Sequence, residues 1–91
     1  MTKIAKSVIQ KEGKYLVILR SPNAKAYPNL WDFPGGKFEP GETPEQTVVR
    51  ETKEEVALEI EAGPMLRIGE YHDDKHDLLF HYFAPKVILI Q

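Results

Sequence analysis

The sequence contains no cysteine, no long apolar run and no cluster of basic residues. The lack of cysteine excludes disulfide bonds and thiolate metal sites. No run approaches the roughly 20 apolar residues of a membrane span, and the first residues lack the apolar core of a signal peptide. A net charge of −2 without a basic cluster argues against binding to polymeric nucleic acid. We therefore expect a cytoplasmic protein that binds neither membranes nor nucleic acid polymers.

The residues that are present are typical of one small globular domain, which we expect to span residues 1–91. Hydrophobic residues make up 42% of the chain and charged residues 29%, as in ordinary soluble domains. A chain of this length can bury a modest core, with little margin of stability.

The hydrophobic pattern predicts an α+β fold. Two strands come first, followed by a long loop, one helix and two or three further strands, which suits a mixed β-sheet with the helix packed on one face. The apolar run 15–19 is predicted to be a buried strand. Other extended segments are expected at 4–10, 58–60, 65–71, 78–83 and 86–90, with a hairpin connection at 11–14. Because nothing obvious covers the opposite face of the sheet, that exposed face predicts a homodimer.

The start of the helix is marked by residues that cap a helix N-terminus. Thr43 is a favourable N-cap, and Pro44 suits the first helical position. Gln46 lies three residues after the cap, as a capping box requires. The helix is expected to continue to about Val56.

The predicted helix has an apolar face and an acidic face. At about 100° per residue, the acidic side chains Glu51, Glu54 and Glu55 share one side. Like charges at i,i+4 weaken a helix by about 0.2–0.5 kcal/mol per pair, so their clustering is unfavourable on its own. A hard divalent cation such as Mg²⁺ or Mn²⁺ would offset the repulsion. The side expected to pack on the sheet carries Val48, Val49, Thr52, Val56 and the stem of Glu45.

Glu-rich helical faces are commonly only solvated surface, so the neighbouring residues decide between the two interpretations. Arg50 lies four residues before Glu54, where it can hold a carboxylate. Gly35 and Gly36 offer backbone that can closely approach a phosphate or a metal. Glu42 supplies another carboxylate just before the helix. Together these residues favour a functional site over a solvated face.

The spacing of these residues resembles the signature of the Nudix hydrolases. The pattern is Gly36, five residues, Glu42, seven residues, Arg50-Glu51-Thr52, one residue, Glu54-Glu55, and it covers 23 residues to Leu58. Segments 31–37 and 41–45 resemble the MutT-like branch in particular. The resemblance implies a Nudix-like mixed sheet with the signature loop and helix on one face.

The implied activity is Mg²⁺- or Mn²⁺-dependent hydrolysis of a nucleoside diphosphate linked to a group X, with water attacking phosphorus. By this resemblance Glu54 and Glu55 would bind the metal, together with the carbonyl of Gly35. Glu51 would orient or deprotonate the attacking water, or share a second metal. The partner would be a small nucleotide.

The remaining signature residues have structural or binding roles by the same resemblance. Arg50 is implied as part of the catalytic group and would pair with Glu42 to hold the loop against the helix, with Gly36 in the bend. We add Arg20, Phe33 and Lys37 as candidate substrate-binding residues. A surface position for Arg20 and a packing role for Phe33 are the ordinary alternatives.

Three departures from the family pattern are visible. Ala57 replaces the usual glycine after the helix, which costs on the order of 1 kcal/mol if the residue is left-handed. Thr52 replaces an aliphatic residue and could bond back to the carbonyl four residues earlier. The usual second helix is missing, so a catalytically weak nucleotide- or protein-binding module is an alternative to the enzyme. A purely structural α+β domain is a further alternative.

Overall fold

The computed structural model describes residues 1–25 and 27–90 and confirms the expected α+β class. The elements follow the predicted order of strands, loop, helix and strands. They are β1 (Thr2–Ser7), β2 (Gln10–Lys11), β3 (Lys14–Tyr15), β4 (Ile18–Leu19), β5 (Trp31–Asp32), β6 (Gly35–Lys37), α1 (Pro44–Val56), β7 (Leu58–Glu61), β8 (Met65–His72), β9 (Asp77–Phe83) and β10 (Lys86–Ile90).

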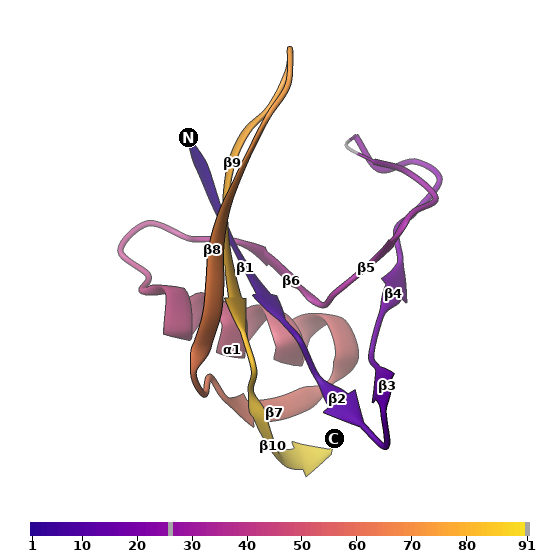
Figure 1. Ribbon diagram of the computed structural model, residues 1–91, viewed down its shortest axis with the longest axis vertical. Helices are drawn as coiled ribbons and strands as arrows, with labels where there is room; N and C mark the ends of the chain where they lie inside the picture. The colour runs from indigo at the N-terminus through magenta and orange to yellow at the C-terminus, as the bar shows by residue number, and fades with distance from the viewer. Residues whose placement is uncertain (26, 91) are drawn as a thin grey trace.

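A mixed four-stranded sheet in the order β6-β1-β9-β8 forms the centre of the molecule (Figure 1). Strand β1 runs parallel to β9, with Ile4 opposite Phe80, and antiparallel to β6, with Ala5 opposite Gly36. Strands β8 and β9 form a long antiparallel hairpin that projects beyond the rest of the sheet (Figure 1). A separate antiparallel pair joins β7 to β10.

Helix α1 begins and ends as the sequence predicts. The hydroxyl of Thr43 accepts a hydrogen bond from the backbone N–H of Gln46 at 3.1 Å, and the Gln46 side chain accepts one from the Thr43 N–H at 2.9 Å. This reciprocal pair satisfies two N–H groups that the helix itself cannot bond. After Val56, Ala57 is left-handed, with φ 57° and ψ 34°. The strain expected of alanine at this position is therefore present.

The core lies between α1 and one face of the sheet. Val48 is fully buried against Ala5, Ile60 and Phe83. Thr52 is also buried, and its hydroxyl lies 2.5 Å from the hydroxyl of Ser7 on β1. The hydrogen-bond partner of the Thr52 hydroxyl is therefore Ser7 on the sheet. The sequence had suggested a backbone carbonyl of the helix itself.

The buried face of α1 is rotated relative to the prediction. Thr47 is fully buried, whereas Val49 and Glu45 are exposed. Glu42, in the loop before the helix, folds over Thr47 and accepts a hydrogen bond from its hydroxyl at 2.9 Å. The prediction for Val49 and Glu45 was wrong because it considered packing on the sheet alone.

The predicted buried strand at 15–19 is wrong. Only short segments, β3 and β4, are extended there, and Tyr15 and Leu19 are 55% and 54% exposed. β3 pairs with β2 and β4 with β5, two residues each, so this part of the chain lies outside the main sheet. The expected hairpin is present, with Glu12 and Gly13 at positive φ in its turn.

The second face of the sheet carries alternate residues of β1 and β9. Side chains alternate between the two faces of a strand. Ala5 and Phe83 point into the core, so their chain neighbours Ile4 and Lys6 on β1 and Tyr82 on β9 point to the second face. α1 is the sole helix in the described part of the chain and covers the first face only (Figure 1). No described helix has the length and apolar character needed to cross a membrane.

Candidate metal and nucleotide site

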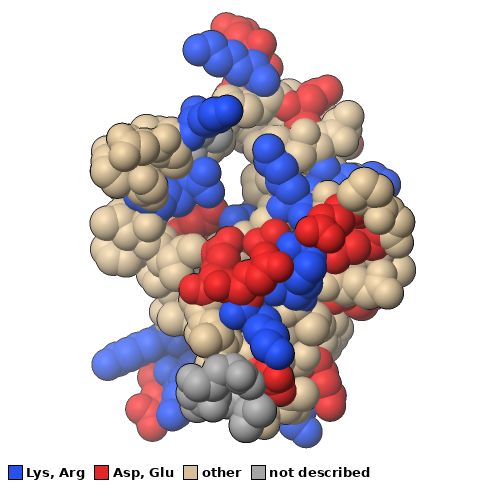
Figure 2. Space-filling view, turned by 180° about the vertical axis from the view of Figure 1, so that it is seen from behind, with Lys and Arg blue, Asp and Glu red and all other residues tan. Residues whose placement is uncertain are grey.

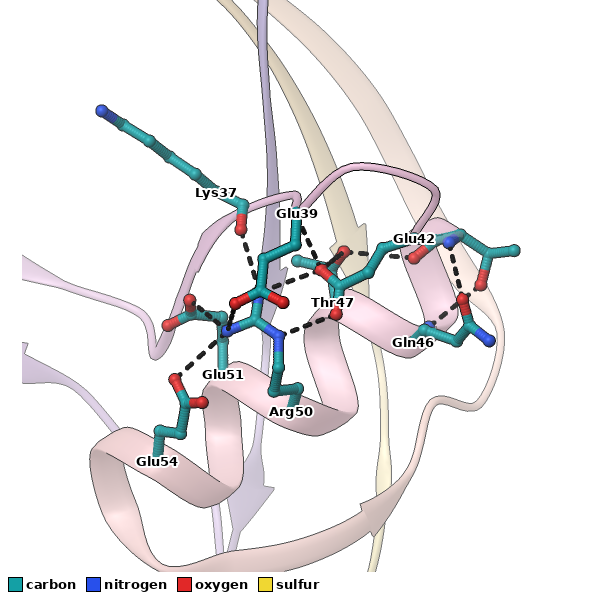
Figure 3. A network of polar contacts seen from close by, with 9 residues as sticks. Lys37, Glu39, Glu42, Gln46, Thr47, Arg50, Glu51 and Glu54 are labelled. Carbon is teal, nitrogen blue, oxygen red and sulfur yellow. Dashed lines mark hydrogen bonds and ion pairs between the residues drawn. The ribbon is translucent and has the colours of Figure 1, made fainter.

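Arg50 is the centre of a polar network that joins α1 to the loop before it (Figure 3). Its Nε and Nη2 donate to the two carboxylate oxygens of Glu42 at 2.7 and 2.9 Å. Nη2 also donates to the backbone carbonyl of Lys37 at 3.1 Å. A bidentate salt bridge of this kind is strong and directional. The guanidinium therefore fixes the loop after β6 against the helix.

Glu42 is held by more than Arg50. It accepts hydrogen bonds from the backbone N–H of Glu39 at 2.8 Å and from the hydroxyl of Thr47 at 2.9 Å. The hydrogen bond from Arg50 is the main reason that the pKa of Glu42 falls to about 2, and the bond from Glu39 adds to it. Glu42 is thus an ionised anchor at neutral pH.

The same guanidinium reaches the acidic face of α1. Nη1 donates to Glu51 at 2.8 Å and to Glu54 at 3.2 Å, and lies 3.7 Å from Glu39. The side chain of Glu51 is 18% exposed, and that of Glu54 is 57% exposed. Figure 2 shows acidic and basic side chains in contact across the face of the molecule that carries α1. The repulsion expected among these glutamates is therefore offset within the protein by Arg50.

The two glycines of β6 let other groups approach closely. A Cβ on Gly36 would lie 2.5 Å from the carboxyl carbon of Glu51. A Cβ on Gly35 would lie 2.0 Å from the backbone oxygen of Ala5. A side chain at Gly35 would therefore collide with the backbone of β1, whereas one at Gly36 would have to displace the Glu51 carboxylate.

Glu55 has a different environment from Glu51 and Glu54. Burial raises its pKa, while the charge of Lys6 and a backbone hydrogen bond from Gly35 act in the opposite direction. Glu55 lines a cavity of about 850 Å³, together with Gly35 and Gly36. Of the three acidic-face residues, it alone belongs to that lining.

The donor chemistry of this helix face fits a hard divalent cation, since glutamate oxygens and a glycine carbonyl are suitable ligands. These candidate ligand atoms do not, however, converge on one point. Within residues 1–25 and 27–90 there is no group of three acidic or histidine side chains placed to hold a metal ion. Arg50 engages Glu51 and Glu54 instead. Binding of a cation would therefore require these two side chains to turn away from Arg50.

The 850 Å³ cavity is lined by residues of β1, β6 and β9 and by Glu55 of α1, and basic residues outnumber acidic ones in its lining. Figure 2 shows a hollow between the tip of the β8–β9 hairpin and the loop before β5. The lining contains five lysine and arginine residues against three aspartate and glutamate residues, although the whole chain has a net charge of −2. The basic residues are Lys6, Arg20, Lys25, Lys37 and Lys75, and the aromatic ones are Tyr27, Trp31, Phe80 and Tyr82.

The three candidate substrate-binding residues do not share one cavity. Arg20 and Lys37 line the 850 Å³ cavity. Phe33 lines a neighbouring cavity of about 670 Å³ and packs edge-on against Tyr15, with ring centroids 6.1 Å apart. The two cavities have Tyr27, Leu78, Phe80 and Tyr82 in common.

Comparison with known proteins identifies the family. The NUDIX domain model matches residues 3–89. The chain belongs to the Nudix family. The resemblance deduced from the signature is thereby confirmed, and its MutT-like character is confirmed by the relatives and neighbours below.

Several named Nudix relatives are longer than this chain. It is 37% identical to the 8-oxo-dGTP diphosphatase of Escherichia coli K12 over 84 residues, covering 91% of this chain and 65% of that protein. It is 38% identical to the CTP pyrophosphohydrolase of the same organism over 63 residues, covering 69% and 46%. Human diphosphoinositol polyphosphate phosphohydrolase 2 is 41% identical over 80 residues, covering 88% and 42%. The chain therefore spans between about two fifths and two thirds of the length of these relatives.

Solved structures match the Nudix fold over nearly the whole chain. The MutT protein of Methanosarcina mazei Go1 superposes with a TM-score of 0.89 at 24% identity, covering 99% of this chain and 66% of that one. A NUDIX hydrolase of Nitrosomonas europaea gives a TM-score of 0.87 at 24% identity, covering 99% and 61%. At this identity the likeness shows the fold.

Two residues of this Nudix site were missed by sequence reasoning. Lys6 and Asp32 both line the larger cavity, and the ammonium of Lys6 donates to Asp32 at 2.7 Å. Strand alternation in β1 was a usable signal, because it puts Lys6 on the face away from the helix. The partner could not be deduced, since β5 and β1 are not paired in one ladder.

Proposed function

We propose that this Nudix domain hydrolyses the pyrophosphate bond of a nucleoside diphosphate linked to a group X. One observation carries the proposal. Glu55 of the acidic helix face lines, together with Gly35 and Gly36, a cavity with a surplus of positive charge, in a chain that is negative overall. A positive cavity concentrates anionic ligands such as phosphates.

The metal in this proposal is Mg²⁺ or Mn²⁺. Its ligands are Glu51, Glu54, Glu55 and the carbonyl of Gly35. When bound, the cation would neutralise phosphate oxygens and lower the pKa of a bound water. The Glu51 carboxylate lies beside Gly36, and from this side of β6 it would orient or deprotonate that water.

The substrate is held by the residues around the cavity. Arg20 and Lys37 bind phosphate oxygens, and Phe33 contacts the base from the adjoining cavity. Arg50 and Glu42 hold the loop against the helix. Glu51 and Glu54, which now bond to Arg50, would have to turn toward a bound cation. The names of the relatives suggest damaged nucleoside triphosphates as the first substrates to examine. The domain extent of 1–91 and the cytoplasmic location stay predictions.

A substrate panel tests this proposal. Purified protein is incubated with 8-oxo-dGTP, the ordinary nucleoside triphosphates, ADP-ribose and a dinucleoside polyphosphate, each with Mg²⁺, Mn²⁺ or EDTA. We expect metal-dependent release of a nucleoside monophosphate that is lost in Glu54→Gln and retained in Glu45→Gln, an exposed glutamate of the same helix. Turnover that survives EDTA or Glu54→Gln contradicts the proposed metal site.

A second candidate is a catalytically weak module that binds a nucleotide or a protein. The engagement of Glu51 and Glu54 by Arg50, without a converged metal group among the described residues, favours it. This candidate predicts saturable nucleotide binding with no product from any member of the panel.

We also propose that the protein forms a homodimer through exposed apolar side chains. Strand β8 is at the edge of the four-stranded sheet and exposes Leu66 and Ile68, and β10 exposes Ile88. Unpaired strand edges with apolar side chains favour association. Light scattering should give twice the monomer mass, and Ile68→Lys should give the monomer while circular dichroism is unchanged. A wild-type protein that is monomeric at high concentration contradicts the dimer.

A further inference from the structure

Lys6 carries a charge in an unusual place. Its side chain is only 7% exposed, although lysine is almost never buried unless it is paired. The ammonium donates to Asp32 Oδ2 at 2.7 Å and to the carbonyl of Phe33 at 3.3 Å. A buried charge without such partners would be strongly unfavourable. Nothing in the metal chemistry proposed above uses this side chain.

Asp32 is shared between two cations. Arg20 Nη1 lies 3.8 Å from Oδ2 of Asp32, the same oxygen that accepts the bond from Lys6. All three residues line the 850 Å³ cavity. One carboxylate between two cations leaves a net positive charge there, and Lys6 limits how far Asp32 can neutralise Arg20.

Arg20 follows a short strand pair that lies outside the four-stranded sheet. β4 and β5 pair over two residues only, and Arg20 follows directly with its backbone N–H bonded to the Leu30 carbonyl at 2.8 Å. Strand β5 has no ladder with β1. The Lys6–Asp32 pair therefore ties the β4–β5 ribbon, and with it Arg20, to the centre of the sheet.

We propose that Lys6 and Asp32 are positioning residues that hold the Arg20 guanidinium at the cavity for the phosphates of the nucleotide. The inference rests on the proposed function, in which Arg20 binds phosphate. Without Lys6, Asp32 is released from β1 and can draw Arg20 into a tighter pair, away from the anion. Without Asp32, the guanidinium loses this ion pair. Both changes weaken substrate binding and keep all the metal carboxylates in the chain, although each also alters the charge near Glu55.

Steady-state kinetics with the best substrate of the panel separate positioning from general stability. We expect Lys6→Met to raise KM by about tenfold with little change in kcat, Lys6→Arg to recover most of the affinity, and Asp32→Asn to resemble Lys6→Met. In an Arg20→Ala background, Lys6→Met should add nothing further. Lys3→Met is the matched control, because Lys3 is an exposed lysine of the same strand that does not line the cavity. Equal effects of Lys6→Met with and without Arg20 overturn the inference.

A measurement without substrate keeps the inference separate from the proposed function. The heteronuclear NOE of the Arg20 Nε–H group reports whether the guanidinium is ordered. We expect an ordered group in the wild type and in Lys3→Met, and a clearly less ordered one in Asp32→Asn. Asp32 is 30% exposed, so this variant should fold even if Lys6→Met does not. An Arg20 group that is already mobile in the wild type overturns the inference. An ordered group in a protein with no affinity for the panel nucleotides overturns the proposed function instead.

Discussion

The Glu51 carboxylate occupies the position that a side chain at residue 36 would take, since a Cβ on Gly36 would lie 2.5 Å from the carboxyl carbon of Glu51. The glycine is required because a carboxylate fills the place where its side chain would be. β6 and α1 thus meet through a glycine on one side and a glutamate on the other. This contact makes residue 36 sensitive to the smallest substitution.

Gly36→Ala should therefore impair catalysis more than folding. The added methyl group must displace Glu51, and a shift of about 1 Å in a reacting group can cost about 10²-fold in rate. Comparison of kcat/KM with the free energy of unfolding checks this. Gly13→Ala is the control, because Gly13 has φ +76° with nothing within 4 Å, so strain should lower its stability without changing turnover. Equal loss of activity in Gly36→Ala and Gly13→Ala would contradict the displacement of Glu51 as the cause.

Ala57→Gly should make the protein more stable. Ala57 is left-handed at φ 57°, a conformation that costs an alanine roughly 1–2 kcal/mol and a glycine almost nothing. In a domain of this size, 1 kcal/mol corresponds to about 4–8 °C in Tm. Thermal unfolding measures the change, with Ala24→Gly, which lacks a positive φ, expected to be neutral or destabilising. A lower Tm for Ala57→Gly would show that the strain is relieved elsewhere.

Glu42 should make stability depend on pH in the acid range. Its pKa is lowered to about 2 from an ordinary value near 4.5, chiefly by the hydrogen bond from Arg50. A depressed carboxyl pKa stabilises the folded state above the unfolded pKa, and that contribution is lost as pH falls through the folded pKa. The stability gap between wild type and Glu42→Gln should therefore be full at pH 7 and should narrow as pH falls from about 4.5 toward 2. Urea unfolding across that range measures the gap, and a constant gap contradicts the assignment.

Thr52→Val should cost stability because of its partner. The Thr52 and Ser7 hydroxyls are both buried and lie 2.5 Å apart. Removing one hydroxyl leaves the other without this partner, which costs about 1–3 kcal/mol. Ser7→Ala with Thr52→Val removes both polar groups, so we expect the double variant to lose less than the sum of the two single variants. Additive losses in urea unfolding would mean that the two hydroxyls are not coupled.

Local features of this chain were the most predictable. The cap at Thr43, the reciprocal bond with Gln46 and the strain at Ala57 depend on a few neighbouring residues, so the sequence contains all the information that they need. Position 57 was identified by comparison with the family pattern, in which a glycine usually follows the helix.

Features that depend on distant partners were predicted less well. The run around Leu19 is apolar enough for a core strand, yet it pairs with β5 outside the main sheet and stays exposed. Val49 was expected to be buried, but the loop carrying Glu42 covers Thr47 instead. Lys6 and Asp32 are 26 positions apart in the sequence, and no local pattern predicts that they pair.

Binding of Mn²⁺ to the acidic face of α1 is the most direct test of the central claim. Electron paramagnetic resonance counts the free ion during titration of wild type, Glu54→Gln and Glu45→Gln. We predict about one bound ion or more per chain in the wild type and in Glu45→Gln. For Glu54→Gln we predict affinity at least about tenfold lower, since even outer partners of a metal site cost about 10–100-fold when lost. Glu54→Gln binding Mn²⁺ as tightly as the wild type, or a wild type that binds none, would contradict the account.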